Sequence, residues 1–224
     1  MRKLVVLTFI TLDGVMQAPG GPEEDTTDGF KYGGWVAGYW DDILGGVMGE
    51  QMAGPFDLLL GRKTYEIFAA YWPYVKSDDP DGPIAVKFNS AKKYVASTTP
   101  EKLDWNNSTL LKGDTVQEIK KLKQQDGPEL QVHGSGNLIQ TLLKHDLIDE
   151  FRLTIFPITF GTGKRLFGNG TIPAGLKLVD SKISTTGVIV ATYERAGIVK
   201  TGLLASETPT EAELARRKKL LEGK

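Results

Sequence analysis

Two glycine turns in this chain carry the residue types best suited to binding phosphate. The first turn is at Gly61, which follows three leucines and precedes Arg62, Lys63 and Thr64. An apolar run that ends in glycine and passes into polar residues predicts a buried strand followed by a helix. The first turn of a helix has free backbone N–H groups and the positive end of the helix dipole. Two cations and a hydroxyl beside those donors indicate a place where a phosphate can bind.

The second turn, His133-Gly134-Ser135-Gly136, also follows an apolar run and opens a helix. Two such turns on alternating strands indicate a nucleotide cofactor with more than one phosphate. Each turn alone also fits an ordinary helix start. Ile139 stands where the dinucleotide-binding fingerprint needs a third glycine, and the run Gly161-Thr162-Gly163-Lys164-Arg165 lacks the spacing of a phosphate-binding Walker loop.

Three carboxylates are candidates for proton transfer. Asp13 follows the first apolar run, at the strand end where α/β proteins place ligands. Asp42 and Glu50 lie on the next expected helix, and a partly buried carboxylate there would have a raised pKa suited to a proton donor. Projection on a helical wheel does not decide between Asp42 and Glu50 as the proton donor. His133 and His145 share no metal-binding spacing, so we expect no metal site.

Composition narrows the class of protein. The chain has 224 residues, of which 40% are hydrophobic, enough for one sizeable core. The net charge of −1 argues against a nucleic-acid partner, and the absence of cysteine excludes disulfides and thiol nucleophiles. No apolar run approaches the roughly 18 residues of a membrane span. We expect a soluble, cytoplasmic protein with no membrane or nucleic-acid partner.

The pattern along the chain predicts an α/β fold. Apolar runs predict strands at 4–10, 57–60, 93–97, 109–111, 129–132, 151–156, 176–182 and 188–194. Helical spacing predicts helices at 35–53, 63–70, 84–89 and 138–143, and Thr115 with Glu118 predicts a capping box that opens another. Strands that alternate with helices and end in a run of strands predict a mostly parallel sheet with an antiparallel C-terminal edge.

Two segments lie outside that pattern. Residues 17–34 are rich in Gly, Pro, Asp and Thr, which predicts a long loop of the kind that covers binding sites. The composition shifts after Gly197, so we expect one domain over residues 1–197 and a tail over residues 198–224. Thr210 is expected to cap a short charged helix in that tail.

Four motifs in order carry a family resemblance. They are Thr11-Leu12-Asp13-Gly14, Leu60-Gly61-Arg62-Lys63-Thr64-Tyr65, Val132-His133-Gly134-Ser135-Gly136-Asn137-Leu138, and Pro157 followed by Gly161-x-Gly163-Lys164-Arg165-Leu166-Phe167. The set resembles the dihydrofolate reductase-like family. It is most similar to the branch shared with the reductase domain of bacterial riboflavin biosynthesis deaminase–reductases. The resemblance covers residues 2–195.

The resemblance implies a single-domain dihydrofolate reductase-like fold that binds NADPH across the carboxyl ends of its strands. The residues it assigns to the cofactor are Thr11, Leu12, Gly61, Arg62, Lys63, Thr64, Ser97, Thr98, Gly134, Ser135, Gly136 and Asn137. The helix around Asp42 would correspond to the one that carries the folate-site carboxylate, and residues 17–34 to a mobile lid. Members of this branch commonly form homodimers, which we also expect here.

These observations lead to two functional hypotheses. The first is an NADPH-dependent reductase that transfers a hydride to a small heterocyclic or carbonyl substrate, with Asp13, Asp42, Glu50 or an ordered water supplying the proton. The second is a nucleotide- or ligand-binding protein of the same fold that has no turnover. The absence of an unambiguous acid among the three carboxylates favours the second hypothesis.

Overall fold

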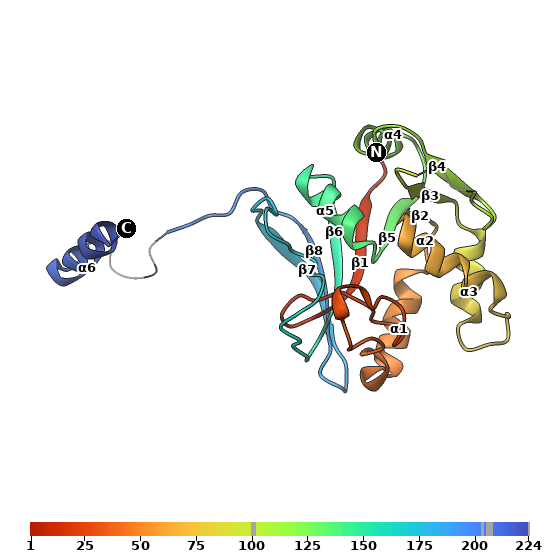
Figure 1. Ribbon diagram of the computed structural model, residues 1–224, viewed down its shortest axis with the longest axis horizontal. Helices are drawn as coiled ribbons and strands as arrows, with labels where there is room; N and C mark the ends of the chain where they lie inside the picture. Colours follow the sequence, from red (N-terminus) through yellow and green to blue (C-terminus); the bar gives the residue numbers. More distant parts are fainter. Residues whose placement is uncertain (100–101, 203, 205–207, 224) are drawn as a thin grey trace.

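A single eight-stranded sheet organises the molecule (Figure 1). The computed structural model describes residues 1–99, 102–202, 204 and 208–223. The strand order is β4-β3-β2-β5-β1-β6-β8-β7. The strands are β1 (Leu4–Thr11), β2 (Phe56–Gly61), β3 (Lys93–Ala96), β4 (Ser108–Leu111), β5 (Glu129–His133), β6 (Glu150–Phe156), β7 (Leu176–Ile183) and β8 (Ile189–Arg195).

The strand directions confirm the predicted fold class. Strands β1 to β6 are parallel to one another, whereas β8 runs antiparallel to both β6 and β7. Central parallel strands are covered on both faces, and the continuous apolar run of β1 is accordingly buried along almost its whole length. The C-terminal strands therefore form the antiparallel edge that the sequence predicts.

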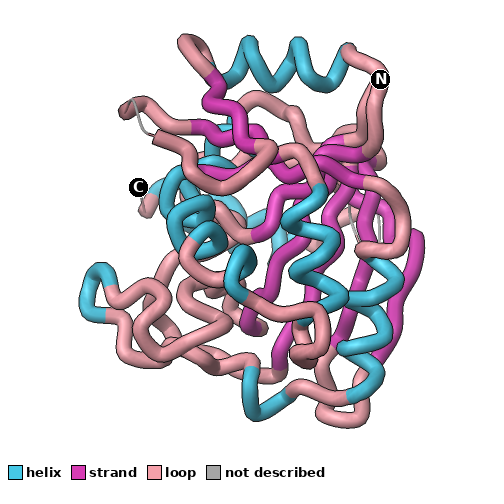
Figure 2. Tube along the Cα trace, turned by 90° about the vertical axis from the view of Figure 1, so that its right-hand side faces the viewer, coloured by secondary structure: helices cyan, strands magenta, loops and turns pink. Residues whose placement is uncertain are grey.

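Helices cover both faces of the sheet, and Figure 2 shows the strands as one layer with helices packed against it. On one face, α4 (Thr115–Gln124) and α5 (Gly136–Lys144) pack on Leu4 and Val6 of β1. On the other, α1 (Asp42–Gln51) packs near Phe156 of β6. On that same face α2 (Arg62–Ala69) and α3 (Gly82–Ser90) pack on Leu58 and Leu60 of β2. Short 3₁₀ turns occupy Thr27–Gly29, Ala37–Tyr39 and Trp72–Tyr74.

Two expected helix starts are wrong in detail, and an aspartate explains each. The expected helix 35–53 is divided into a 3₁₀ turn and α1, because Asp41 is extended and accepts a hydrogen bond from the Leu44 N–H at 2.9 Å. In α4 the cap is Asp114 rather than Thr115, and its carboxylate accepts from the Val116 N–H at 2.9 Å. Aspartate is among the strongest N-cap residues, and apolar spacing alone does not locate a cap.

The C-terminal segment contains α6 (Glu211–Glu222), which Figure 1 draws apart from the sheet. As expected, Thr210 caps it, accepting from the Glu213 N–H at 3.3 Å. No described residue of α6 is buried. The division of the chain after residue 197 stays a prediction. Among the described residues, no helix combines the length and apolar character needed to cross a membrane.

Candidate functional site

The predicted cofactor residues lie at one edge of the sheet, where the parallel strands end. Strands β3, β2, β5 and β1 are consecutive neighbours, and in that register Gly61 pairs with Ala96 and Leu7 with His133. The candidate residues follow directly after these four strand ends. Three inter-strand spacings of about 4.8 Å extend about 14 Å, room for an elongated ligand across the edge.

A hydrogen bond joins the two glycine turns. The Ser135 hydroxyl accepts from the Gly61 N–H at 3.0 Å. Ser135 is left-handed, with φ 64°, which turns its side chain away from its own helix and towards β2. A Cβ added at Gly61 would lie 3.5 Å from the Ser135 Cβ, so the turns are in direct contact.

Helices α2 and α5 begin at these turns without a side-chain cap. By contrast, α1, α4 and α6 are each capped by a side chain, while α3 also lacks such a cap. The first-turn N–H groups of two neighbouring helix starts and their positive dipole ends form an environment for an anion. Arg62 and Lys63 are exposed beside them, and Arg62 makes an ion pair with Glu66 at 2.9 Å.

Residues after β3 add polar groups beside the first turn. The Ser97 hydroxyl donates to the Thr99 carbonyl at 3.0 Å, while Thr98 is exposed. Because Ala96 is in register with Gly61, these two residues follow the strand end next to Arg62 and Lys63. The structure therefore brings the three predicted phosphate-binding segments to one place.

The segment after β1 extends the edge on its other side. The Thr11 hydroxyl donates to Asp13 and accepts from the Val15 N–H at 2.9 Å. Leu12 between them is exposed. Further along, the Met16 Sδ would be 3.9 Å from a Cβ placed on Gly136. The loop after β1 thus approaches the start of α5, and the four predicted segments border one surface.

Asp13 connects this loop to the one after β6. Its carboxylate accepts from the Gly161 N–H at 2.8 Å and the Phe160 N–H at 3.3 Å. Burial disfavours the charged form, but the hydrogen bonds from Thr11, Gly161 and Phe160 outweigh it and lower the pKa of Asp13. A carboxylate held ionised in this way orients the loop and is poorly suited to donate a proton at neutral pH.

The other two candidate carboxylates are separated by the length of α1. Asp42 is exposed in the first turn of α1. The preceding residue, Asp41, accepts a hydrogen bond from the N–H of Thr185, which lies between β7 and β8. Glu50 is in the last turn and makes an ion pair with Lys182 at 2.6 Å. Since α1 leads into β2, its last turn faces the amino edge of the sheet. The structure does not bring Glu50 to the predicted cofactor residues.

A clasp of polar residues, absent from the sequence-based site, holds the long loop. We define the clasp as Gln17, Asp25, Thr27 and Lys164. The Lys164 ammonium contacts Asp25 at 2.5 Å and the Thr27 hydroxyl at 2.6 Å. The buried Gln17 amide accepts from the Lys164 N–H at 3.0 Å and donates to the Asp25 and Thr27 carbonyls. No periodicity or motif marks Gln17, since its burial results from contacts far along the chain.

His133 ends β5 as a buried, neutral side chain. Its Nε2 lies 2.9 Å from the Gln131 Oε1. The Gln131 amide nitrogen donates to the Gln51 carbonyl and to Glu129, so its oxygen accepts from the histidine. The rings of Phe56, Phe68 and Phe88 surround the imidazole. Burial, helped by the charge of Arg152, lowers the pKa of His133 to about 3.

Comparison with known proteins assigns the family. Residues 2–190 match the RibD C-terminal domain. The chain belongs to this family. The Bacillus subtilis protein YyaP is 32% identical over 200 residues, covering 88% of this chain and 96% of YyaP. A second B. subtilis protein, YwjB, is 28% identical over 81% of this chain and 91% of its own length.

Solved structures place this RibD C-terminal domain relative in the dihydrofolate reductase-like fold. A putative riboflavin biosynthesis protein from Shewanella sp. PV-4 has a TM-score of 0.63 at 24% identity, covering 87% of this chain and 99% of its own. Dihydrofolate reductase from Enterococcus faecalis, complexed with NADP(H), has a TM-score of 0.52 at 14% identity, covering 86% of this chain and 96% of its own. A pyrimidine reductase-like protein from Corynebacterium diphtheriae has a TM-score of 0.53 at 12% identity, covering 87% of this chain and 92% of its own. The fold predicted from the sequence is confirmed.

Proposed function

We propose that this RibD C-terminal domain protein is an NADPH-dependent reductase that acts on a small heterocyclic or carbonyl substrate. The observation that carries the proposal is the junction of the two uncapped helix starts through the Ser135–Gly61 hydrogen bond. Two neighbouring sets of first-turn N–H groups suit two linked phosphates better than one. The reductase names of the fold relatives support the same reading.

The donor set fits an adenine dinucleotide phosphate. Gly134, Ser135, Gly136 and Asn137 would hold the pyrophosphate from α5, while Arg62, Lys63 and Thr64 would hold phosphate oxygens from α2. Ser97 and Thr98 would flank the 2′-phosphate of the adenosine. Thr11, Leu12 and the ionised Asp13 would position the nicotinamide end. The bound cofactor would supply the hydride, and the protein its orientation and the exclusion of water.

The proton would come from water or from Asp42 rather than from Asp13. The lowered pKa of Asp13 leaves it ionised, and its hydrogen bonds to the Gly161 and Phe160 N–H groups hold the loop in place. Asp42 stands at the end of α1 near the carboxyl edge. In this proposal Asp13 is a positioning residue. Glu50, at the far end of α1, would have no part in the hydride transfer.

Titration of the pure protein with NADPH and NADH tests the proposal. We expect NADPH to bind well below the millimolar range, and Ser135→Ala to weaken it because the contact between the turns is lost. Ser181→Ala on the exposed strand β7 is the matched control. Loss of the reduced nicotinamide absorbance with a panel of pterins, pyrimidines and carbonyl compounds would then identify the substrate class. Failure of both cofactors to bind below the millimolar range would refute the reductase proposal.

A binding protein without turnover is the second candidate. The observation in its favour is that Asp13 is engaged in holding the loop, so the first candidate acid lacks a proton to give. This candidate predicts that NADPH binds and that no member of the panel oxidises it. Oxidation by one member removes this candidate.

A further inference from the structure

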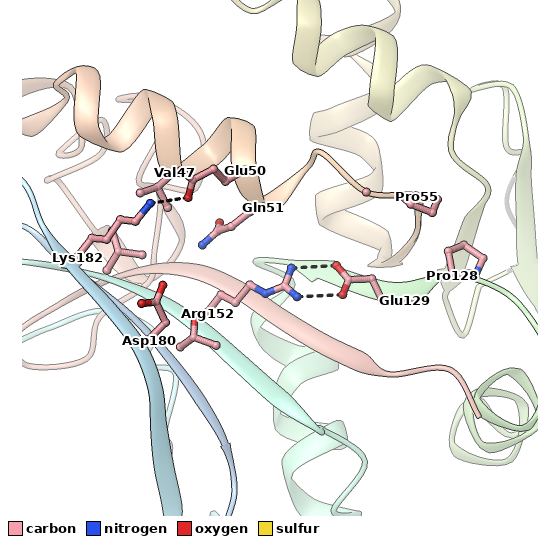
Figure 3. Close-up of a pocket in the computed structure, with 12 residues that line it drawn as sticks. Val47, Glu50, Gln51, Pro55, Pro128, Glu129, Arg152, Asp180 and Lys182 are labelled. Atoms are coloured by element: carbon pink, nitrogen blue, oxygen red, sulfur yellow. Dashed lines mark hydrogen bonds and ion pairs between the residues drawn. The ribbon is translucent and has the colours of Figure 1, made fainter.

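A cavity at the opposite edge of the sheet has no part in the proposed reaction (Figure 3). It measures about 540 Å³, within the range of sites that bind small molecules. Its walls come from the last turn of α1, residues 54–55, the start of β5, and strands β6, β7 and β8. The cavity lies towards the amino ends of the strands. Arg152 in its wall lies four residue steps, about 13 Å, before the end of β6 at Phe156.

The cations in this cavity are already engaged by carboxylates. Arg152 donates two parallel hydrogen bonds to Glu129, both at 2.9 Å, and a third to Glu150 at 2.6 Å. Lys182 is paired with Glu50 at 2.6 Å. Figure 3 shows both pairs at the cavity wall. Because these positive groups are satisfied, the cavity has no cation left to attract an anionic ligand.

Polar groups without partners also point into the cavity. The side chains of Gln51, Asp180 and Thr192 make no hydrogen bond or ion pair with any part of the chain that the structure describes. Figure 3 shows Gln51 and Asp180 directed towards the space beside Arg152. Asp180 is therefore an uncompensated carboxylate beside a set of balanced ion pairs. The other two groups, the Gln51 carboxamide and the Thr192 hydroxyl, can accept hydrogen bonds.

Apolar surfaces complete the lining. Val47, Pro55, Pro128 and Val190 contribute flat or branched hydrocarbon surfaces around the polar centre. Such a mixture favours a ligand with a compact apolar or ring-shaped body and a few hydrogen-bond donors. The surplus carboxylate makes a positive charge on that ligand favourable.

We propose that this cavity is a second ligand site, specific for a small organic cation such as an amine or amidine on an apolar or ring-shaped body. Asp180 pairs with the cationic group, Gln51 and Thr192 accept from its remaining donors, and the valines and prolines hold the body. Hydride transfer needs the reacting atoms about 3–3.5 Å apart. Arg152 in the cavity wall lies about 13 Å along β6 from the cofactor edge, so a ligand in the cavity is too far away to accept the hydride. The cavity acts as an accessory or effector site.

Three probes of nearly equal shape and different charge test the proposal: benzamidine, benzamide and benzoate. Binding is measured on the full chain by calorimetry and by changes in amide NMR spectra. We expect benzamidine to bind at least tenfold more tightly than benzamide, with no measurable binding of benzoate. The resonances that move should belong to residues around 50–55, 128–129 and 180–192. NADPH affinity is measured in the same samples, so a failure of the proposed reductase function is seen separately.

Two variants with matched controls decide the assignment. Asp180→Asn should weaken benzamidine at least tenfold and leave benzamide unchanged, whereas Asp126→Asn, an equal charge change on an exposed turn, should have no effect. A Cβ added at Gly54 meets no atom within 4 Å, so Gly54→Phe should fold and obstruct the cavity, with Gly46→Phe on α1 as the control. Equal binding of benzamidine and benzoate, or benzamidine binding that neither variant weakens, would overturn the proposal.

Discussion

At the scale of single residues, Arg62 offers the sharpest test of the cofactor. We expect Arg62→Ala to weaken NADPH by about 1.5–3 kcal/mol, the range for a lost hydrogen bond to a charged group. The affinity for NADH should fall less than that for NADPH if Arg62 contacts the 2′-phosphate. The two affinities should fall equally if Arg62 contacts the pyrophosphate. Calorimetric titration of both cofactors measures the difference.

Glu66→Gln is the control for that substitution. Arg62 pairs with Glu66, so a change at Arg62 also releases that carboxylate. Removing the negative charge alone should leave NADPH affinity unchanged or slightly increased. Unchanged affinity for both cofactors in Arg62→Ala would remove Arg62 from the site.

His133 gives a prediction about pH. Its pKa is lowered to about 3 in the folded protein, against about 6.5 in an unfolded chain. Between these values the unfolded state binds the proton and the folded state does not. The free energy of unfolding should therefore fall as the pH decreases below about 6.5, by about 1.4 kcal/mol per pH unit from this residue.

Denaturant unfolding at several pH values between 4 and 7 measures this dependence. His133→Asn should remove that part of the slope, whatever its effect on stability at pH 7. His145→Asn, at an exposed position, should leave the slope as in the unmodified protein. If His133→Asn kept the pH slope of the unmodified chain, as His145→Asn is expected to, the assignment of the slope to His133 would be contradicted.

At the scale of elements, the clasp sets how firmly the long loop is held. Lys164→Met would remove the contacts with Asp25 and Thr27 while keeping the backbone bond to Gln17. Amide hydrogen exchange over residues 17–34 should become about tenfold faster, corresponding to about 1.4 kcal/mol, with little change in the core strands. Lys121→Met, which removes an exposed ion pair with Glu118 in α4, is the control. Unchanged exchange in the loop would contradict a role of the Lys164 ammonium in holding it.

Local patterns predicted the elements because each has a strong one-dimensional signal. The three leucines before Gly61 and the apolar run of β1 mark buried strands, and glycines mark the turns that follow. What the sequence did not predict depends on distant partners. Ser135 accepts from Gly61, 74 positions earlier, and Lys164 reaches Asp25 across 139 positions. Such contacts exist only once the sheet has brought the loops together.

At the scale of the whole molecule, the two edges of the sheet differ in chemistry. The carboxyl edge has the first turns of α2 and α5, which lack side-chain caps, together with exposed cations, and this favours anions. The amino edge has the balanced ion pairs of Arg152 and Lys182 together with Asp180, which has no ion-pair partner among the described residues, and this favours cations. Under the two proposals, this opposition would let the two edges of one sheet hold two unlike ligands without competition between them. It is also why the benzamidine and NADPH measurements are expected to be independent.

Strand β7 leaves one side of the molecule open to association. Every residue of this edge strand is exposed, including Leu178, Val179 and Ile183. An edge strand with exposed apolar side chains is prone to pair with another chain unless it is covered. We propose a homodimer to which this edge contributes, together with the segment after Gly197.

Light scattering of the full chain and of a version ending at Gly197 tests both parts of that proposal. We expect a dimer mass for the full chain, and weaker association after truncation, because α6 exposes Leu214, Leu220 and Leu221 and none of its residues is buried against the part of the chain that the structure describes. A helix of 12 residues with so little packing gains stability mainly by docking on a partner. Ile183→Lys, which places a charge on the exposed edge strand, should shift the full chain towards monomer. A monomeric full-length protein would refute the dimer, and an equally stable dimer after truncation would refute the role of the tail.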